Sequence, residues 1–200
     1  MLRVGKGKKT MKGKMLWQTL RLFMIMKSSK RTEYMKKHEI YKAIGDDCNI
    51  QSRKIPLYSR LIKIGNNVRI ASGVTFITHD VTHSMLNSHP LYRENQFKEK
   101  VGCIEIKDNV FIGAGATILY DVSIGPDVII GAGSLVNKDV PRNSVVAGTP
   151  AKVIGTLDDY VAKRINMNTY PQEIAPENET VSDELVDWCW EQFYKSHGAQ

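Results

Sequence analysis

The side chains best suited to acid–base chemistry lie within six residues, Thr-His-Asp-Val-Thr-His at positions 78–83. An unperturbed imidazole titrates near about pH 6.5, so either histidine can take a proton from an alcohol at neutral pH. General base catalysis of this kind is worth about 10²- to 10⁴-fold in rate. Asp80 could orient an imidazole or stabilise its cation. His79, Asp80 and His83 are therefore the candidate catalytic residues, whereas His89 is more simply read as a surface histidine.

The element that must position these residues is a six-residue repeat over residues 106–141. A six-residue period fits neither a 3.6-residue helix nor the two-residue alternation of a strand. It is typical of a hexapeptide solenoid, in which short parallel strands stack into a prism with three hexads per turn. Aliphatic residues occupy Ile106, Ile112, Ile118, Ile124, Ile130 and Val136, and the places four further on are Val110, Ala116, Val122, Val128, Ser134 and Val140.

The repeat begins earlier and is interrupted once by a long insertion. Ile44 and Ile50 are six residues apart, and Ile64, Ile70 and Phe76 resume the period after a gap. The next core places would be Thr82, Ser88, Glu94 and Lys100, and polar residues buried there without partners would be costly. We therefore predict a mainly β chain with a β-helix domain at 44–155, about four coils long, from which residues 82–105 protrude as a functional loop.

Helices are expected on both sides of this domain. Residues 1–43 form a basic arm and two helices, at 16–27 and 32–43, with Thr32 as a plausible N-cap of the second. Residues 156–200 form a helical tail, with a short helix at 157–165. A final helix follows Ser182, which caps it, and runs to Tyr194.

Charge is distributed unevenly along the chain. The formal net charge is +7, yet residues 1–37 contain twelve Lys or Arg and one acidic residue, so the remainder is mildly acidic. Such an arm could associate weakly with a membrane surface. No aromatic residues alternate with the basic ones as nucleic-acid binding would require. The apolar run at 15–26 is too short to span a bilayer.

Cysteine usage indicates a reducing compartment. The three cysteines, Cys48, Cys103 and Cys189, are odd in number and widely spaced, and no Cys-x-x-Cys occurs. We therefore expect free thiols in a cytoplasmic protein rather than a disulfide framework or a zinc site.

Three features in combination resemble the hexapeptide-repeat O-acetyltransferases. They are the hexads, the segment GVTFITHD at 73–80 with its following loop, and the ending VVAGTPAKVIG at 145–155. The closest similarity is to galactoside, maltose and capsular-polysaccharide acetyltransferases, with streptogramin acetyltransferases as cousins. The resemblance implies a left-handed β-helix, a homotrimer, and acetyl-coenzyme A bound between neighbouring subunits as cosubstrate, with no metal. It also implies that a loop histidine deprotonates the hydroxyl of a saccharide or other small-molecule acceptor, which attacks the thioester directly.

The resemblance also assigns residues to the coenzyme. His79 matches the base of the sugar-modifying members, and His83 lies at the offset of the base in the streptogramin branch, so we favour His79. Small residues allow the pantetheine arm to approach the backbone, and basic residues suit the nucleotide phosphates. The residues carried over for coenzyme binding are Gly113, Ala114, Ala132, Asn137, Lys138 and Lys152.

Three alternatives remain open from the sequence. A streptogramin-type acetyltransferase would keep the fold and the cosubstrate and change the acceptor. A metal-dependent hydratase would use His79, His83 and His89 as ligands at a subunit interface, because zinc takes three protein ligands and a water. A non-catalytic β-helix scaffold would need none of these histidines.

Overall fold

The computed structural model describes residues 6–165, 167, 169–177 and 180–198, with the backbone alone at 6–12 and 14. The chain forms two compact units, and the boundary between them along the sequence lies between Tyr160 and Val161. The first unit contains the solenoid and the N-terminal helices, and the second contains the C-terminal helix α5 (Asp183–His197).

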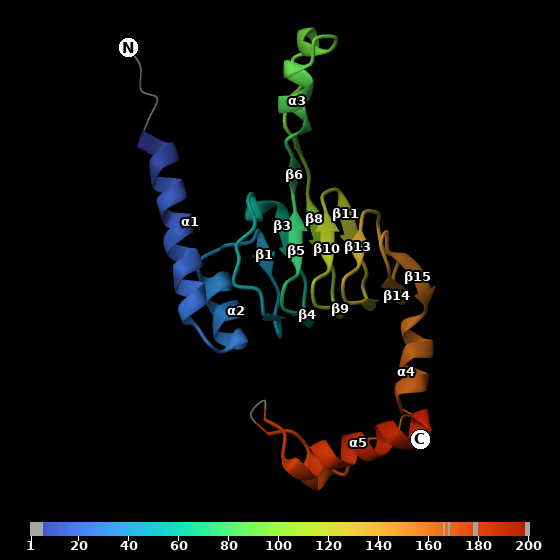
Figure 1. The fold of residues 1–200 in the computed structure, drawn as a ribbon. Coiled ribbons are helices and arrows are strands. Elements are labelled where there is room, and N and C mark those ends of the chain that lie inside the picture. The colour runs from blue at the N-terminus through green and yellow to red at the C-terminus, as the bar shows by residue number, and fades with distance from the viewer. Residues whose placement is uncertain (1–5, 166, 168, 178–179, 199–200) are drawn as a thin grey trace. The chain divides into compact units, whose positions relative to one another are not determined.

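The solenoid of the first unit is built from three parallel sheets, A, B and C, and each turn of the chain adds one strand to each sheet (Figure 1). The first complete turn is β3, β4 and β5, the next is β8, β9 and β10, and the third is β11, β12 and β13. Sheet A contains β1 (Ala43–Ile44), β3 (Ile62–Ile64), β8 (Ile104–Ile106) and β11 (Val122–Ile124). Sheet B contains β2 (Asn49–Ile50), β4 (Val68–Ile70), β9 (Val110–Ile112), β12 (Val128–Ile130), β14 (Ser144–Ala147) and β15 (Lys152–Gly155). Sheet C contains β5 (Thr75–Ile77), β10 (Thr117–Leu119) and β13 (Leu135–Val136).

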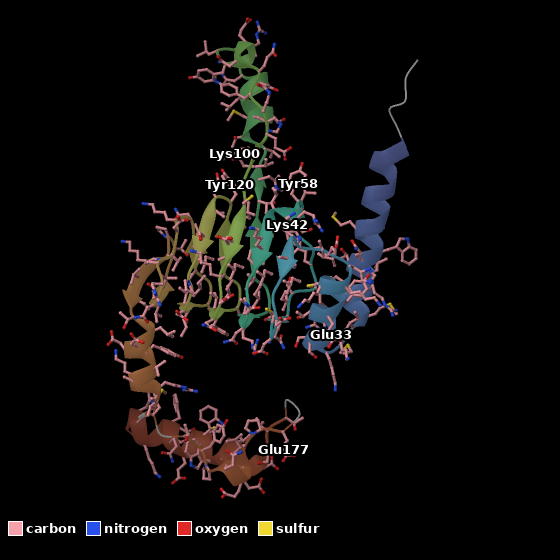
Figure 2. All side chains as sticks on the ribbon, turned by 180° about the vertical axis from the view of Figure 1, so that it is seen from behind. Glu33, Lys42, Tyr58, Lys100, Tyr120 and Glu177 are labelled. Atoms are coloured by element: carbon pink, nitrogen blue, oxygen red, sulfur yellow. The ribbon has the colours of Figure 1, made fainter. Side chains whose placement is uncertain are left out.

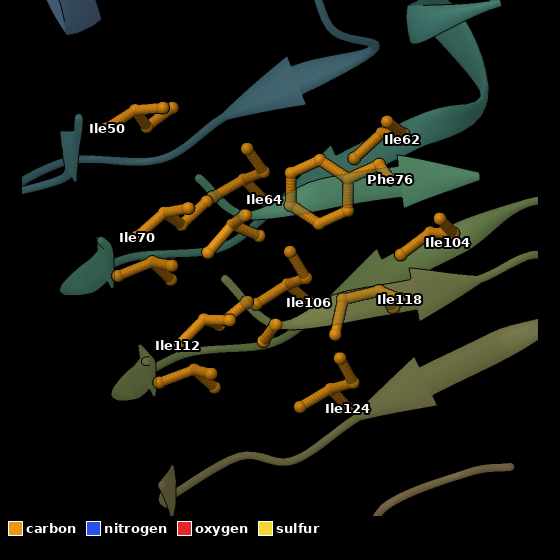
Figure 3. Packing of buried hydrophobic residues seen from close by; sticks show 14 of the residues in the cluster. Ile50, Ile62, Ile64, Ile70, Phe76, Ile104, Ile106, Ile112, Ile118 and Ile124 are labelled. Carbon is orange, nitrogen blue, oxygen red and sulfur yellow. The ribbon is translucent and has the colours of Figure 1, made fainter. Parts of the chain in front are cut away.

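The predicted aliphatic places form the core. In sheet B, Ile70 is registered with Ile112, and Ile112 with Ile130. In sheet C, Phe76 is registered with Ile118. These side chains point into the solenoid and stack in rows (Figure 3). Apolar neighbours registered one turn apart explain why the six-residue period was readable in the sequence.

Asparagine and aspartate residues turn the corner between sheets A and B. Asn67, Asn109, Asp127 and Asn143 all have positive φ, a conformation that these two residue types tolerate better than most. Their side chains also bond from turn to turn. Asn67 Nδ2 donates to Asn109 Oδ1 at 3.0 Å, and Asn109 Nδ2 donates to Asp127 Oδ1 at 2.8 Å. The sequence analysis did not identify this ladder.

An arm leaves the solenoid after sheet C, as predicted, but its boundaries differ. Its base is an antiparallel pair, β6 (His79–Asp80) with β7 (Lys100–Val101), and it carries α3 (Thr82–Ser88) and η2 (Arg93–Asn95) (Figure 1). The predicted loop end at residue 105 was wrong, because β8 already returns Ile104 to the core. Ile104 lies two residues before Ile106 on the same inward face, and it is six residues before Val110, so it belongs to the second series of places in the repeat.

The two N-terminal helices are α1 (Lys6–Met24) and α2 (Ser28–Lys37). The predicted cap at Thr32 was wrong, since the N-cap of α2 is Lys27. Thr32 is instead buried within the helix, where its Oγ1 donates to Ser28 O at 3.0 Å and accepts from Ile50 N at 2.8 Å. Its hydroxyl therefore fastens α2 to the first strand of sheet B. Among the described residues, no helix has the length and apolarity that a bilayer crossing requires.

After the solenoid the chain reverses and becomes helical. β15 pairs antiparallel with β14, and α4 (Leu157–Ile165) follows, as predicted. In the second unit, η3 (Gln172–Ile174) precedes α5, and Ser182 caps α5 by accepting from Leu185 N at 3.2 Å. The predicted cap is thus confirmed, and the helix extends past Tyr194 to His197.

Candidate active site

His79 lies where the arm leaves the solenoid. It is three residues beyond the buried core residue Phe76 and begins β6. The preceding residue, Thr78, is fully buried; its Oγ1 donates to Leu57 O at 2.7 Å and its carbonyl accepts from Gly102 N at 2.9 Å. Both segments at the base of the arm are therefore fixed to the solenoid, and His79 is carried on this rigid base rather than at the tip of the loop.

The imidazole of His79 packs against Tyr58. The two ring centroids are 5.1 Å apart and the rings meet edge to face. Tyr58 Oη lies 3.2 Å from Glu99 Oε2, and this hydrogen bond raises the pKa of the phenol, which stays a neutral donor. His79 Nδ1 is shut off from solvent and has no hydrogen-bond partner among the described residues. Proton exchange with an acceptor would therefore fall to Nε2.

Asp80 fastens the arm to the next turn of the solenoid. Its Oδ1 accepts from Thr82 Oγ1 at 2.6 Å and from Thr82 N at 3.1 Å, and its Oδ2 accepts from Tyr120 Oη at 2.6 Å. The hydrogen bonds from Thr82 and Tyr120 are the main cause that lowers the pKa of Asp80 to about 2, and the charge of His83 adds a smaller effect in the same direction. In the described structure Asp80 thus bonds to hydroxyls rather than to either imidazole.

We expect Asp80 to contribute to stability only above its own titration range. An unfolded aspartate titrates near about pH 3.9, and the folded pKa is lower. The contribution of Asp80 to stability is therefore complete above the unfolded pKa and is lost as pH falls through the folded pKa of about 2. The melting temperature of Asp80→Asn should decline less steeply than that of the native chain as pH falls through this window. Asp187→Asn on α5 controls for loss of a carboxylate, and parallel curves for native and Asp80→Asn would contradict the expectation.

Lys100 completes the base of the arm. Its Nζ forms a 2.6 Å ion pair with Asp121 Oδ2 and lies 5.5 Å from the centroid of the Tyr120 ring. Figure 2 shows Tyr58, Tyr120 and Lys100 gathered where the arm joins the solenoid. The sequence analysis missed the tyrosines and treated Lys100 only as a misplaced core residue. The signal that could have found Tyr120 was the register of the repeat. Tyr120 lies two residues beyond Ile118, as Thr78 lies two residues beyond Phe76, so Tyr120 is expected next to the start of the arm.

The other two histidines of the arm differ from His79. His83 is in α3, half-buried, and its Nδ1 is also enclosed without a described partner. His89 stacks on Tyr92 with centroids 4.6 Å apart, and its Nδ1 accepts from Leu91 N at 3.2 Å. Within the part of the chain that the structure describes, no three His, Cys, Asp or Glu side chains are grouped as metal ligands.

The small residues predicted for the coenzyme lie at the corner between sheets B and C. Gly113 follows β9, and its N donates to Ile130 O at 2.8 Å; Ala114 O accepts from Gly133 N at 2.8 Å. Ala114 and Ala132 are exposed, one turn apart. This corner therefore presents a strip without large side chains, along which a slender ligand can reach the backbone.

Gly113 itself is required by the close approach of the next turn. A Cβ at this position would lie 2.5 Å from Ala132 N, a backbone atom. We expect Gly113→Ala to destabilise the solenoid by about 1–3 kcal/mol, the usual cost of overpacking, measured by denaturant unfolding. Gly155→Ala is the matched control, because nothing lies within 4 Å of a Cβ there. Equal stability of the two variants would contradict this reading.

The predicted basic residues lie elsewhere on the surface. Lys138 is two residues beyond Val136, which is registered with Ile118 one turn away. It therefore occupies the His79 corner, about 10 Å along the solenoid at about 4.8 Å per turn. Lys152 is on the edge strand β15, opposite Ala147. Asn137, Lys138 and Lys152 are all exposed. The structure thus places Lys138 at the same corner of the solenoid as His79, two turns further on, and the alanines at the other edge of sheet C.

A family model described as "Bacterial transferase hexapeptide (six repeats)" matches residues 104–138, the stretch from β8 to just past β13. Galactoside O-acetyltransferase of Lactococcus lactis is 30% identical over 68% of this chain and 72% of its own length. Protein CapG of Staphylococcus aureus is 34% identical over 66% of this chain and 75% of its own. The chain spans about half the length of other curated relatives that it matches, such as 45% of the Escherichia coli galactoside O-acetyltransferase.

Among solved structures, galactoside acetyltransferase in complex with coenzyme A superimposes with a TM-score of 0.56, covering 89% of this chain and 94% of that one at 24% identity. At this identity the superposition demonstrates a shared fold. The two sequence relatives are aligned over more than two thirds of their own length, and this chain carries the hexapeptide repeat. The chain therefore belongs to the hexapeptide-repeat acetyltransferase family.

Proposed function

We propose that this protein transfers the acetyl group of acetyl-coenzyme A to a hydroxyl of a saccharide. The observation that carries the proposal is the placement of His79 on the rigid base of the arm, with Nδ1 enclosed and Nε2 left for proton exchange. The relatives named galactoside O-acetyltransferase support an acetyl donor and a sugar acceptor. The three cysteines are free, which suits the proposed cytoplasmic location.

The reaction proceeds by direct attack. His79 takes the proton of the acceptor hydroxyl as its oxygen bonds to the thioester carbonyl carbon, giving a tetrahedral intermediate. The carbon–sulfur bond then breaks, and the coenzyme A thiolate leaves. The imidazolium returns the proton to the sulfur, so the products are an acetyl ester and a free thiol. The enzyme is unchanged at the end of the cycle, and no metal is required by this sequence of steps.

The site is completed between chains. His79 and the strip at Ala114 and Ala132 lie at opposite ends of the strands of sheet C within one chain. A trimer of left-handed β-helices, in which the arm of one subunit reaches the alanine strip of the next, brings the base to the thioester. Lys138 and Lys152 bind the phosphates of the nucleotide, with Asn137 beside Lys138, while Gly113 lets the backbone at the alanine strip lie close to the pantetheine arm.

Mixed assemblies test this arrangement. His79→Ala removes the base, and Ala132→Phe blocks the strip with a bulky side chain, so each variant alone should be inactive. Random co-assembly should restore about one quarter of native activity, because that share of interfaces would combine an intact histidine with an intact strip. Activity of the mixture no higher than that of the separate variants would contradict a site shared between chains.

The experiment that tests the proposed activity is thiol release from acetyl-coenzyme A across a panel of acceptors. The panel contains free saccharides, nucleotide sugars and streptogramin antibiotics, each with and without protein. We expect release with at least one sugar-containing acceptor, with its acetyl ester identified by NMR. Release with streptogramins alone would reassign the acceptor, and no acceptor-dependent release in any arm would overturn the proposal.

A further inference from the structure

One face of α1 is apolar and remains uncovered in the first unit. Trp17 is 75% exposed and Phe23 is 58% exposed, and Leu20 is also exposed. Leu16, Met24 and Met26 add to the same exposed apolar surface. Large apolar side chains exposed together at the end of α1 and just beyond it indicate a binding surface.

The opposite side of this segment is already used. Leu22 is fully buried in the core cluster that includes the solenoid residues. The buried Arg31 donates through Nη1 to Ile25 O at 2.8 Å and to Met26 O at 2.6 Å, and through Nη2 to Gln51 O at 3.2 Å. The end of α1 is thus fixed to α2 and to the start of the solenoid. The exposed apolar side chains consequently lie on the side of the helix opposite Leu22.

The charge around this face is positive. Residues 1–37 contain twelve basic residues and one acidic residue, Glu33, which is paired with Lys30 at 3.2 Å. Arg21 and Lys27 are exposed near the apolar face. A groove between α1 and α2 is lined by Trp17, Arg21, Lys30, Tyr34 and Lys37, among others. Aromatic and basic side chains that lie close together are suited to the headgroup region of an anionic bilayer, where the rings contact acyl chains and the cations contact phosphates.

Helix α5 offers a comparison within the same chain. It also exposes aromatic residues, Trp190 at 54% and Phe193 at 46%. However, α5 carries Asp183, Glu184, Asp187 and Glu191 against a single lysine, Lys195. Two helices with similar apolar exposure therefore differ in the sign of their charge, and only α1 is complementary to an anionic surface.

We propose that α1 is an interfacial docking helix for an anionic lipid bilayer. It lies in the plane of the membrane, with Trp17, Leu20 and Phe23 at the boundary between headgroups and acyl chains, while Arg21 and Lys27 contact lipid phosphates. This inference goes beyond the proposed acetyl transfer and does not depend on it. Its consequence is that the arm and His79 act close to a membrane surface, where lipid-linked saccharides are accessible as acceptors.

Flotation of the full chain with lipid vesicles tests the proposal. The probes are phosphatidylcholine vesicles and vesicles in which about a third of the lipid is phosphatidylglycerol. Native protein should float with the anionic vesicles, less so at high salt, and remain free with phosphatidylcholine alone. The triple variant Trp17→Ser, Leu20→Ser, Phe23→Ser should bind at least about tenfold more weakly. Arg21→Gln and Lys27→Gln should each weaken binding about fivefold.

The matched control is Trp190→Ser with Phe193→Ser on α5, which should float like the native chain. Unchanged melting temperatures show that the variants are folded. Failure of the native protein to float, or native-like flotation of the triple variant, would overturn the proposal. A change in assembly mass of the triple variant with unchanged flotation would also overturn it, because the face would then lie between copies of the chain. Acetyl transfer to a free saccharide is measured separately, so loss of one function does not mask the other.

Discussion

Replacement of His79 by alanine is expected to lower kcat by about 10²- to 10⁴-fold, which is the usual contribution of a general base. The KM for acetyl-coenzyme A should change little, because in the proposed mechanism the side chain acts on the acceptor hydroxyl rather than on the coenzyme. Initial rates of thiol release with both substrates varied separately measure the two effects.

His83→Ala provides the comparison that the arm itself offers. His83 belongs to α3, one step further along the arm, and its Nδ1 is enclosed in the same way. We expect this variant to keep most of the native kcat. The reverse result, with a large loss for His83→Ala and little for His79→Ala, would transfer the base to α3 and favour the streptogramin-type arrangement.

Replacement of both Lys138 and Lys152 by alanine should raise the KM for acetyl-coenzyme A strongly. Hydrogen bonds to charged groups contribute about 1.5–3 kcal/mol each, which corresponds to about tenfold to hundredfold per lysine. Both side chains are exposed and available to phosphates. The measurement is the KM for acetyl-coenzyme A beside that for S-acetylpantetheine, which lacks the nucleotide and its phosphates.

Comparing acetyl-coenzyme A with S-acetylpantetheine as acetyl donors distinguishes the loss of a phosphate contact from a general loss of structure. The double variant should use S-acetylpantetheine as well as the native chain does, while its advantage for acetyl-coenzyme A disappears. Lys107→Ala, an exposed lysine at a different corner, is the control for lost surface charge. An equal loss with both donors would show that the lysines do not bind the nucleotide.

The solenoid could be predicted because each turn repeats the same local requirement. An inward aliphatic residue every six positions is visible in one dimension, and the registered pairs such as Ile112 with Ile130 are those that the period predicts. The Ser182 cap was readable for the same reason, since the capping side chain and its donor, Leu185 N, are three residues apart. Thr32 was misread because its true partner, Ile50 N, is eighteen residues away.

The surroundings of His79 were not readable from local sequence. Tyr58 is twenty-one residues before His79 and has positive φ, and Glu99, the residue just before β7, contacts it. Tyr120 reaches Asp80 only because the next turn of sheet C places it there. The histidines and the aspartate near the repeat boundary could thus be named as candidates from the sequence, whereas the groups that position them depend on the three-dimensional stacking of turns.

The central claim is that the chain moves an acetyl group from acetyl-coenzyme A to an acceptor hydroxyl with His79 as the base. The most direct measurement follows acetyl-coenzyme A labelled with ¹³C at the acetyl carbonyl, in the presence of a saccharide, for native protein and His79→Ala. The account predicts that the label appears as an ester on the saccharide, with one free thiol for each ester, and that the rate collapses in the variant. Equal rates of label transfer for the native chain and His79→Ala would contradict it.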